Sequence, residues 1–479
     1  MDKFVATVAL IGIVIVVASL LSGFIERVGI PLVAAFLLLG AALGPSGFGL
    51  VDIQLNSPEL RVLAILGLAL VLFSDAVTVD IREVRDRRRL VWTVLGPGTL
   101  LPAILIAFAA HWILGLRPAA SAILGAALAS TDPVLLRSVL RAPALPPTAR
   151  VALRLESGMN DALLVPIIVL STLALQHSVT AEGGPGLGRT LIGLFVLGPA
   201  FGAIIGWVGI TMLSTVRSRV GVRRDYESLY ALGLGFAAYA AAESVGGSGF
   251  LAAFAAGLAI AALDVELCDC FLEYGEATSE MLLLLTFVAF GTSLVWTGFS
   301  VADWRTLLFA AFALTARTAV LYPVLARIDV RGRDRTLIAL FGPRGLSSLL
   351  LVLLPIFAGV AGAERLFTIT CLVVLLSLVV HGAIIGFYVR GSTPSTRAPV
   401  PLRKPSAEDD ETERITIEEV RLLEKSGDPV IFVDARAPRS FLADAQQIAG
   451  AVRIPPDDPE RAATEQLLSK HATLVVYCA

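Results

Sequence analysis

A cluster of polar residues inside a long apolar segment is the part of this chain most suited to chemistry. The cluster reads Glu156-Ser157-Gly158-Met159-Asn160-Asp161, within a segment, 151–175, that is otherwise mostly apolar. A second carboxylate, Asp132, lies in Ser130-Thr131-Asp132-Pro133, between two further apolar stretches. Ionisable side chains at membrane depth cost about 2.5–3.5 kcal/mol each on insertion scales, so they are rare and usually functional. Acids on neighbouring spans therefore predict an ion site.

Helical spacing brings the oxygen atoms of this cluster together. Ser157 and Asp161 are four residues apart and share a face, and Asn160 adjoins that face. Thr131 and Asp132 are expected to add oxygen atoms from the facing segment. Oxygen ligands suit a small hard cation, whereas His or Cys would indicate a transition metal. A buried Asp161 carboxylate that holds either a proton or a metal ion would suffice for exchange.

Two arginines, Arg317 and Arg344, also lie in apolar segments. A buried guanidinium needs a partner because it does not lose its charge by deprotonation. Glu156 is the expected partner of Arg317, and Arg344 is expected to face helix ends or Asp132. The alternative is that Asp161 and Glu156 are both structural and pair with these arginines. We favour the structural role for Glu156 and the functional role for Asp161.

Composition places the chain among polytopic all-α membrane proteins. It has 479 residues, of which 56% are hydrophobic and 16% charged, and its mean hydropathy is +0.80. Soluble domains carry about 25% charged residues. A net charge of −2 gives no electrostatic argument for a nucleic-acid partner. Four cysteines offer no disulfide framework, and no cofactor is expected.

Apolar stretches long enough to span a bilayer predict about 13 transmembrane helices. The expected ranges are 4–24, 31–49, 60–79, 90–115, 119–141, 150–176, 189–216, 226–244, 249–264, 280–297, 302–326, 336–360 and 366–390. The first is expected to be retained, since it is longer than a signal-peptide core and leads into another span. Arginines gather in alternate loops, which places the N-terminus outside and the C-terminus in the cytoplasm. The acidic inside loop 264–280 breaks this pattern.

Helix-breaking residues interrupt two of the predicted spans. Pro133 directly follows Asp132, and the twelfth span contains Phe341-Gly342-Pro343-Arg344-Gly345-Leu346-Ser347. Irregular backbone at membrane depth is tolerated only inside protein or beside a cavity. Interrupted helices in corresponding positions of two chain halves indicate an inverted-repeat transporter.

Together these motifs resemble the monovalent cation:proton antiporter superfamily, on its sodium/proton exchanger branch. The resemblance covers about residues 1–390 and includes Leu72-Phe73-Ser74-Asp75-Ala76 and His381-Gly382. It implies a homodimer with two crossed, broken helices and alternating access. By matching position it makes Asp161 the carrier of Na+ or a similar cation and of the proton. It places Thr131, Asp132, Ser157 and Asn160 around Asp161, with Glu156 in a supporting ion pair, and the Asn-Asp pair implies electroneutral exchange.

Some residues depart from the family pattern. Gly158-Met159 replaces bulkier apolar residues, and Ala162 stands where glycine is frequent. These departures leave the choice among sodium, lithium and potassium open. Asp75 is interpreted as an interfacial residue at the cytoplasmic end of its helix.

After residue 390 the composition changes to that of a linker, 391–413, and then of a small soluble α/β segment, 414–479. The strands expected at 429–434 and 474–478 resemble a partial rhodanese-like domain, in which the strand-end Cys478 would carry sulfur. The sequence ends at Ala479, so the family's anion-binding loop and the helix after it are not part of it. We therefore expect no sulfurtransferase activity from this chain, and a regulatory or vestigial role is the interpretation we favour.

The sequence thus predicts a transporter in the plasma membrane and not an enzyme. It would exchange a monovalent cation, with Na+ as the expected ion, for H+. Two alternatives stay open: a membrane-anchored rhodanese-type sulfurtransferase or sulfur sensor, and a K+ efflux or channel-like protein. The first leaves the acids at membrane depth unexplained, and the second would conduct without stoichiometric proton coupling.

Overall fold

The computed structural model describes most of the membrane region and three short parts of the C-terminal segment. The described residues are 32–45, 47–140, 142, 145–177, 186–219, 224–263, 281–282, 284–328, 330–392, 430–436, 447–454 and 473–477, with residues 12, 16 and 466. The first predicted span, apart from residues 12 and 16, lies outside them, as do the acidic loop and Cys268, Cys270 and Cys478. The chain divides into two units, Met1–Ser395 and Thr396–Ala479.

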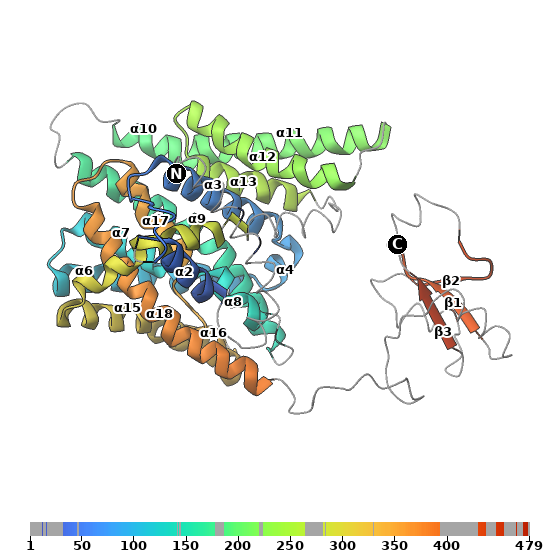
Figure 1. Cartoon of the computed structure of the whole chain (residues 1–479). Coiled ribbons are helices and arrows are strands. Elements are labelled where there is room, and N and C mark those ends of the chain that lie inside the picture. Colours follow the sequence, from blue (N-terminus) through green and yellow to red (C-terminus); the bar gives the residue numbers. More distant parts are fainter. Residues whose placement is uncertain are drawn as a thin grey trace. The chain divides into compact units, whose positions relative to one another are not determined.

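The first unit is helical (Figure 1). Its helices are α2 (Leu32–Leu43), α3 (Pro58–Val77), α4 (Ile81–Asp86), α5 (Arg88–Leu95), α6 (Pro97–Leu114), α7 (Pro118–Ala129), α8 (Pro133–Leu140), α9 (Pro147–His177), α10 (Leu187–Ile192), α11 (Gly198–Arg219), α12 (Arg224–Ser244), α13 (Gly249–Ala262), α15 (Trp304–Ala326), α16 (Gly332–Leu340), α17 (Leu346–Phe357) and α18 (Ala363–Ser392). The described part of this unit also contains two π-helical turns, η1 (Gly193–Leu197) and η2 (Phe290–Leu294), and one 3₁₀ helix, η3 (Val295–Val301).

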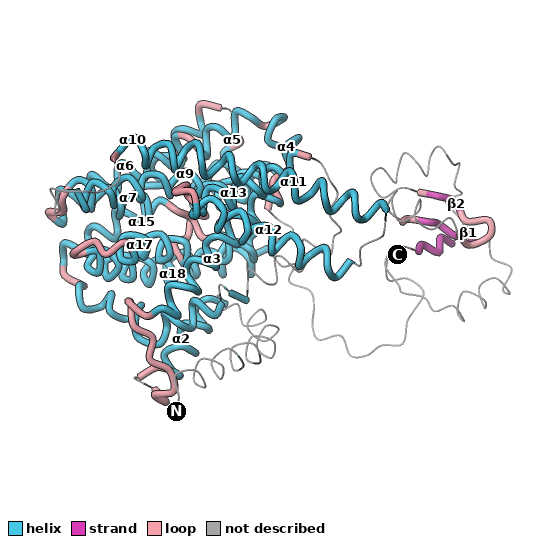
Figure 2. The backbone as a smooth tube through the Cα atoms, turned by 90° about the horizontal axis from the view of Figure 1, so that it is seen from above, coloured by secondary structure: helices cyan, strands magenta, loops and turns pink. Residues whose placement is uncertain are grey.

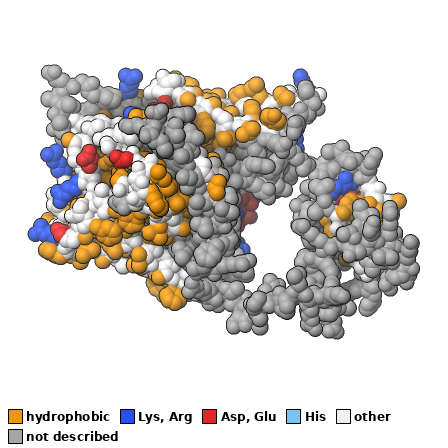
Figure 3. Space-filling view, in the orientation of Figure 1, with side chains coloured by type: hydrophobic (Ala, Val, Ile, Leu, Met, Phe, Trp, Pro, Cys, Tyr) orange, Lys and Arg blue, Asp and Glu red, His pale blue; other side chains and the backbone are white. Residues whose placement is uncertain are grey.

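Eight helices in the described residues are long and apolar enough to cross a membrane. Thirteen spans therefore stay a prediction, and all-α architecture is confirmed for the described membrane region. Large apolar side chains such as Trp207 and Met212 on α11 are more than half exposed. Figure 3 shows apolar side chains over much of the described surface, with arginines at its margins. Apolar exposure of this extent fits contact with lipid.

The helices pack in two groups. One contains α3, α11, α12 and α13, which run side by side in both views (Figures 1 and 2). In the other, α6 packs against α7 and α15, while α7 packs against α9 and α17 against α18. Helices α9 and α17 also contact α3, so the two groups meet beside the polar cluster.

Both predicted interruptions are present. The first helix ends at Ala129 and resumes as α8 at Pro133, and the second ends at Leu340 and resumes as α17 at Leu346. Proline fits the first turn of α8 because it donates no backbone hydrogen bond there. Each break frees backbone groups that need other partners.

The second unit contains a three-stranded parallel sheet in the order β2-β1-β3, formed by β1 (Val430–Asp434), β2 (Val452–Arg453) and β3 (Thr473–Tyr477). Both strands expected from the sequence are thus present, and their ends agree with the expected ranges to within one residue. Asp434, at the end of the central strand, is buried and paired with Arg436.

Candidate functional site

The two helix breaks contact each other through Asp132. Its backbone N–H donates to the carbonyl of Pro343 at 3.0 Å. Its Oδ1 accepts from the backbone N–H of Val134 at 2.8 Å, and its Oδ2 accepts from that of Leu346 at 2.6 Å. One carboxylate therefore caps the N-terminal ends of both α8 and α17, where negative charge is stabilising.

Arg344, in the second helix break, bonds the C-terminal end of the first interrupted helix, α7. Its side chain is fully buried, and Nη1 donates to the carbonyls of Ala129 and Ser130 at 2.7 and 2.8 Å. A cation at the C-terminal end of α7 balances the partial negative charge there. Arg344 was expected to face either helix ends or Asp132, and in the structure its guanidinium bonds the end of α7. Among the described residues, its Nε and Nη2 have no hydrogen-bond partner.

Asp161 lies in the middle of α9, buried beside both breaks. Its Oδ1 accepts a hydrogen bond of 2.5 Å from the Ser130 hydroxyl, and the Ser347 hydroxyl also interacts with this carboxylate. Each break thus contributes one hydroxyl group to Asp161. Neither serine was among the predicted ligands, although both are small polar residues next to the breaks.

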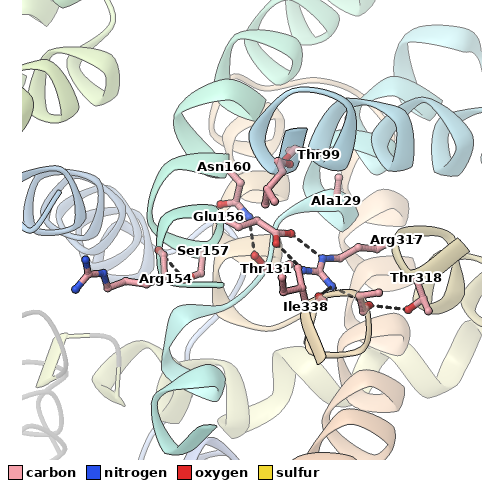
Figure 4. A network of polar contacts seen from close by, with 12 residues as sticks. Thr99, Ala129, Thr131, Arg154, Glu156, Ser157, Asn160, Arg317, Thr318 and Ile338 are labelled. Atoms are coloured by element: carbon pink, nitrogen blue, oxygen red, sulfur yellow. Dashed lines mark hydrogen bonds and ion pairs between the residues drawn. The ribbon is translucent and has the colours of Figure 1, made fainter. Parts of the chain in front are cut away.

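The neighbouring residue on α9, Asn160, faces the first break (Figure 4). Its Nδ2 donates to the Thr131 hydroxyl at 2.8 Å, and both residues are buried. Within the described part of the chain, its Oδ1 has no hydrogen-bond partner. A buried amide oxygen without a donor is unusual and suits a cation ligand.

Ser157 is buried one turn from Asp161, but its hydroxyl donates to the carbonyl of Arg154 at 3.3 Å. It shares the helix face expected for a ligand, yet in this structure it contacts its own helix. A second acid, Asp75 on α3, approaches the same face. A Cβ atom added at Gly158 would lie 3.3 Å from the Cβ of Asp75, so this glycine permits the close approach. Asp75 is half-buried there.

Glu156 and Arg317 form a two-pronged ion pair (Figure 4), with Nε to Oε1 at 2.6 Å and Nη2 to Oε2 at 2.5 Å. Nη1 of Arg317 also donates to the carbonyls of Ile338 and Ala339, at the end of α16. Both charged side chains are buried. The pair thus connects α9 and α15 to the second broken helix.

The chain matches a known protein family. Residues 13–391 match the family described as "Sodium/hydrogen exchanger, transmembrane". The chain belongs to this family.

The K(+)/H(+) antiporter NhaP2 of Shewanella baltica (strain OS223) is 28% identical over 377 residues, which are 77% of this chain and 63% of the relative. The Na(+)/H(+) antiporter 2 of Zygosaccharomyces rouxii is 26% identical over 387 residues, which are 70% of this chain and 45% of the relative. The chain therefore spans less than two thirds of the length of either.

The sodium proton antiporter MjNhaP1 from Methanocaldococcus jannaschii has a similar fold. The TM-score is 0.63 at 21% sequence identity, and the match covers 80% of this chain and 100% of that one. The family match and this fold identify the membrane region as an antiporter-type bundle.

Proposed function

We propose that this chain is a secondary antiporter that exchanges a monovalent cation for protons by alternating access. The observation that carries the proposal is the position of Asp161, a buried carboxylate that receives hydroxyl groups from both broken helices. Such a group has two ways to be neutralised in a dry site: it binds a proton, or it binds a cation.

The buried charges at the crossing support electroneutral exchange. They are three carboxylates and two guanidinium groups: Asp132, Glu156, Asp161, Arg317 and Arg344. With all five ionised, one negative charge is left uncompensated. One monovalent cation or one proton would neutralise it, so a one-for-one exchange leaves the site equally charged in both loaded states.

In the proposed cycle Asp161 holds the proton or the cation, with the hydroxyl groups of Ser130 and Ser347 beside it. A hydroxyl donates to an ionised carboxylate and, after rotation, offers a lone pair to a cation. Asn160 contributes its free oxygen, and Thr131 fixes the orientation of that amide. Ser157 becomes a ligand if its hydroxyl rotates from the Arg154 carbonyl toward Asp161. Asp132 contributes charge and holds the two half-helices, and the pairs of Glu156 with Arg317 and of Arg344 with α7 keep the crossing neutralised.

Sodium is the cation we propose, with potassium as the alternative. Some relatives are named K(+)/H(+) antiporters and another is named a Na(+)/H(+) antiporter. The oxygen donors at Asp161 accept either ion chemically. A transport measurement with each ion separates the two.

We further propose a homodimer in the plasma membrane, with the N-terminus outside and the C-terminal segment in the cytoplasm. The span Leu187–Arg217 is the least buried of the eight, which leaves its surface available for lipid or a second copy.

Residues 1–390 would form the transporter, 391–413 the linker and 414–479 a partial rhodanese-like domain. The parallel sheet of the second unit is compatible with that last assignment. A regulatory role in sensing sulfur or thiols is the second candidate function, for this unit alone.

The test uses liposomes that contain the full chain and a pH-sensitive dye. Sodium, lithium, potassium and calcium are added in turn, and Asp161→Asn is compared with Asp52→Asn, which changes an exposed acid. We expect proton movement with one or more monovalent cations, lost in Asp161→Asn and retained in Asp52→Asn. No proton movement with any cation, in folded wild-type protein, would overturn the proposal.

A further inference from the structure

Helix α18 carries two buried polar side chains one turn apart, and the proposed cycle uses neither. Ser377 is fully buried and His381 is 6% exposed. The Ser377 hydroxyl oxygen lies 3.1 Å from Nδ1 of His381. Burying an imidazole in a membrane-spanning bundle is costly, so this pair calls for a function.

Ser377 contacts the second helix break directly. The backbone N–H of Arg344 donates to its hydroxyl oxygen at 2.7 Å. Arg344 lies between the end of α16 and the start of α17, so its N–H has no carbonyl of a continuous helix to bond. Leaving such a donor unpaired inside the protein is unfavourable. Ser377 supplies the missing acceptor from a different helix.

The position of Arg344 in turn affects the cation site. Its guanidinium donates to the carbonyl of Ser130, and the hydroxyl of Ser130 donates to Asp161. A continuous series of contacts therefore runs from His381 through Ser377, Arg344 and Ser130 to the carboxylate. Both helix breaks therefore belong to one series of contacts that begins at His381.

We propose that His381 and Ser377 are positioning residues that hold the second helix break and thereby set the affinity of Asp161 for the transported cation. This inference rests on the proposed antiport. A hydroxyl has one proton and two lone pairs, so Ser377 accepts the Arg344 N–H and still bonds the imidazole in either tautomer. The imidazole fixes the rotamer of Ser377 in which its oxygen faces Arg344.

Variants at position 381 show which imidazole nitrogen the positioning role requires. An asparagine at 381 places a polar atom near the position of Nδ1, a glutamine places it near Nε2, and leucine provides neither. Ser377→Ala removes the acceptor for Arg344 without touching the histidine. His111→Leu is the matched control, because His111 lies on α6, away from α18, and its Nδ1 bonds the carbonyl of Leu116 in the loop after α6.

The experiment measures KM and maximal rate for the driving cation in liposomes with each full-length variant. The loss of one buried hydrogen bond of about 1 kcal/mol corresponds to about a fivefold change in affinity. We expect His381→Leu and Ser377→Ala to raise KM by about fivefold or more. The KM of His381→Asn should lie within about twofold of the wild-type value, and the KM of His381→Gln should not. The KM of His111→Leu should equal that of wild type.

Other outcomes are equally informative. If wild type exchanges ions and all these variants keep its KM, or if Asn and Leu at 381 behave alike, the positioning role is wrong. If wild type itself moves no protons, the proposed antiport fails first. If His381→Leu does not fold, Ser377→Ala and the comparison of Asn with Gln decide the question.

Discussion

The Ser130 hydroxyl donates a 2.5 Å hydrogen bond to the Asp161 carboxylate, joining the first helix break to the unbroken helix α9. The donor stabilises the ionised form of the acid, because a protonated carboxyl gains less from accepting a hydrogen bond. Ser130 thus helps to decide how readily Asp161 exchanges its proton for a cation.

Replacement of Ser130 by alanine should therefore weaken cation binding without removing exchange. Loss of the hydrogen bond to a charged group costs about 1.5–3 kcal/mol, which predicts at least a tenfold rise in KM at fixed pH. Rates of dye quenching over a range of cation concentrations measure it. Ser300→Ala, which alters an exposed serine, is the control. An unchanged KM in Ser130→Ala would show that this contact has no part in cation affinity.

Glu156→Gln should destabilise the protein, because it leaves the Arg317 charge buried without its partner. Removal of one member of a buried ion pair costs about 3–5 kcal/mol. Thermal unfolding in detergent reports the change as a lower midpoint. Glu83→Gln is a matched control, since it breaks the Arg154–Glu83 pair, whose side chains are 48% and 25% exposed. Such a pair contributes about 0–1 kcal/mol. Equal midpoints for the two variants would contradict the structural role of Glu156.

The sequence predicted much of this arrangement because its signals are local. Pro133 and Gly342-Pro343 disfavour a continuous helix, and a buried Arg317 requires an acid. The roles of Ser130, Ser347 and Ser377 were not predicted, since many hydroxyl groups lie in these helices and only tertiary packing selects those that face Asp161 or Arg344. The two caps made by Asp132 were missed for the same reason: one of its partners, Leu346, is far away in the sequence.

Asp132→Asn separates a capping role from a ligand role. Asparagine keeps one acceptor oxygen and replaces the other with an N–H₂ group that cannot accept from Leu346 or Val134. We expect a lower unfolding midpoint, equivalent to about 1–3 kcal/mol, together with a higher KM for the cation, because one negative charge at the crossing is lost. A variant of normal stability that has lost cation affinity would instead make Asp132 a direct ligand.

The second unit has its own pH dependence. Hydrogen bonds from the Arg436 guanidinium lower the pKa of Asp434 to about 2, below the usual value of about 3.9 in an unfolded chain. A lowered pKa means that this pair stabilises the sheet fully above about pH 4 and loses its effect as the pH falls toward about 2. Hydrogen exchange of β1 in the full chain, corrected for intrinsic rates, should be faster in Asp434→Asn than in wild type at pH 7. Equal protection at neutral pH would contradict the role of this pair.

Competition between the proton and the cation at Asp161 makes a final prediction about transport. If both occupy the same carboxylate, the apparent KM for the cation rises as the pH falls, approaching about tenfold per pH unit once the protonated form predominates. The maximal rate with saturating cation should change far less, because enough cation displaces the proton. Initial rates measured with equal pH on both sides of the membrane, from acid to alkaline conditions, test this. A KM that stays constant with pH, in protein that exchanges ions, would mean that the proton and the cation bind at different groups.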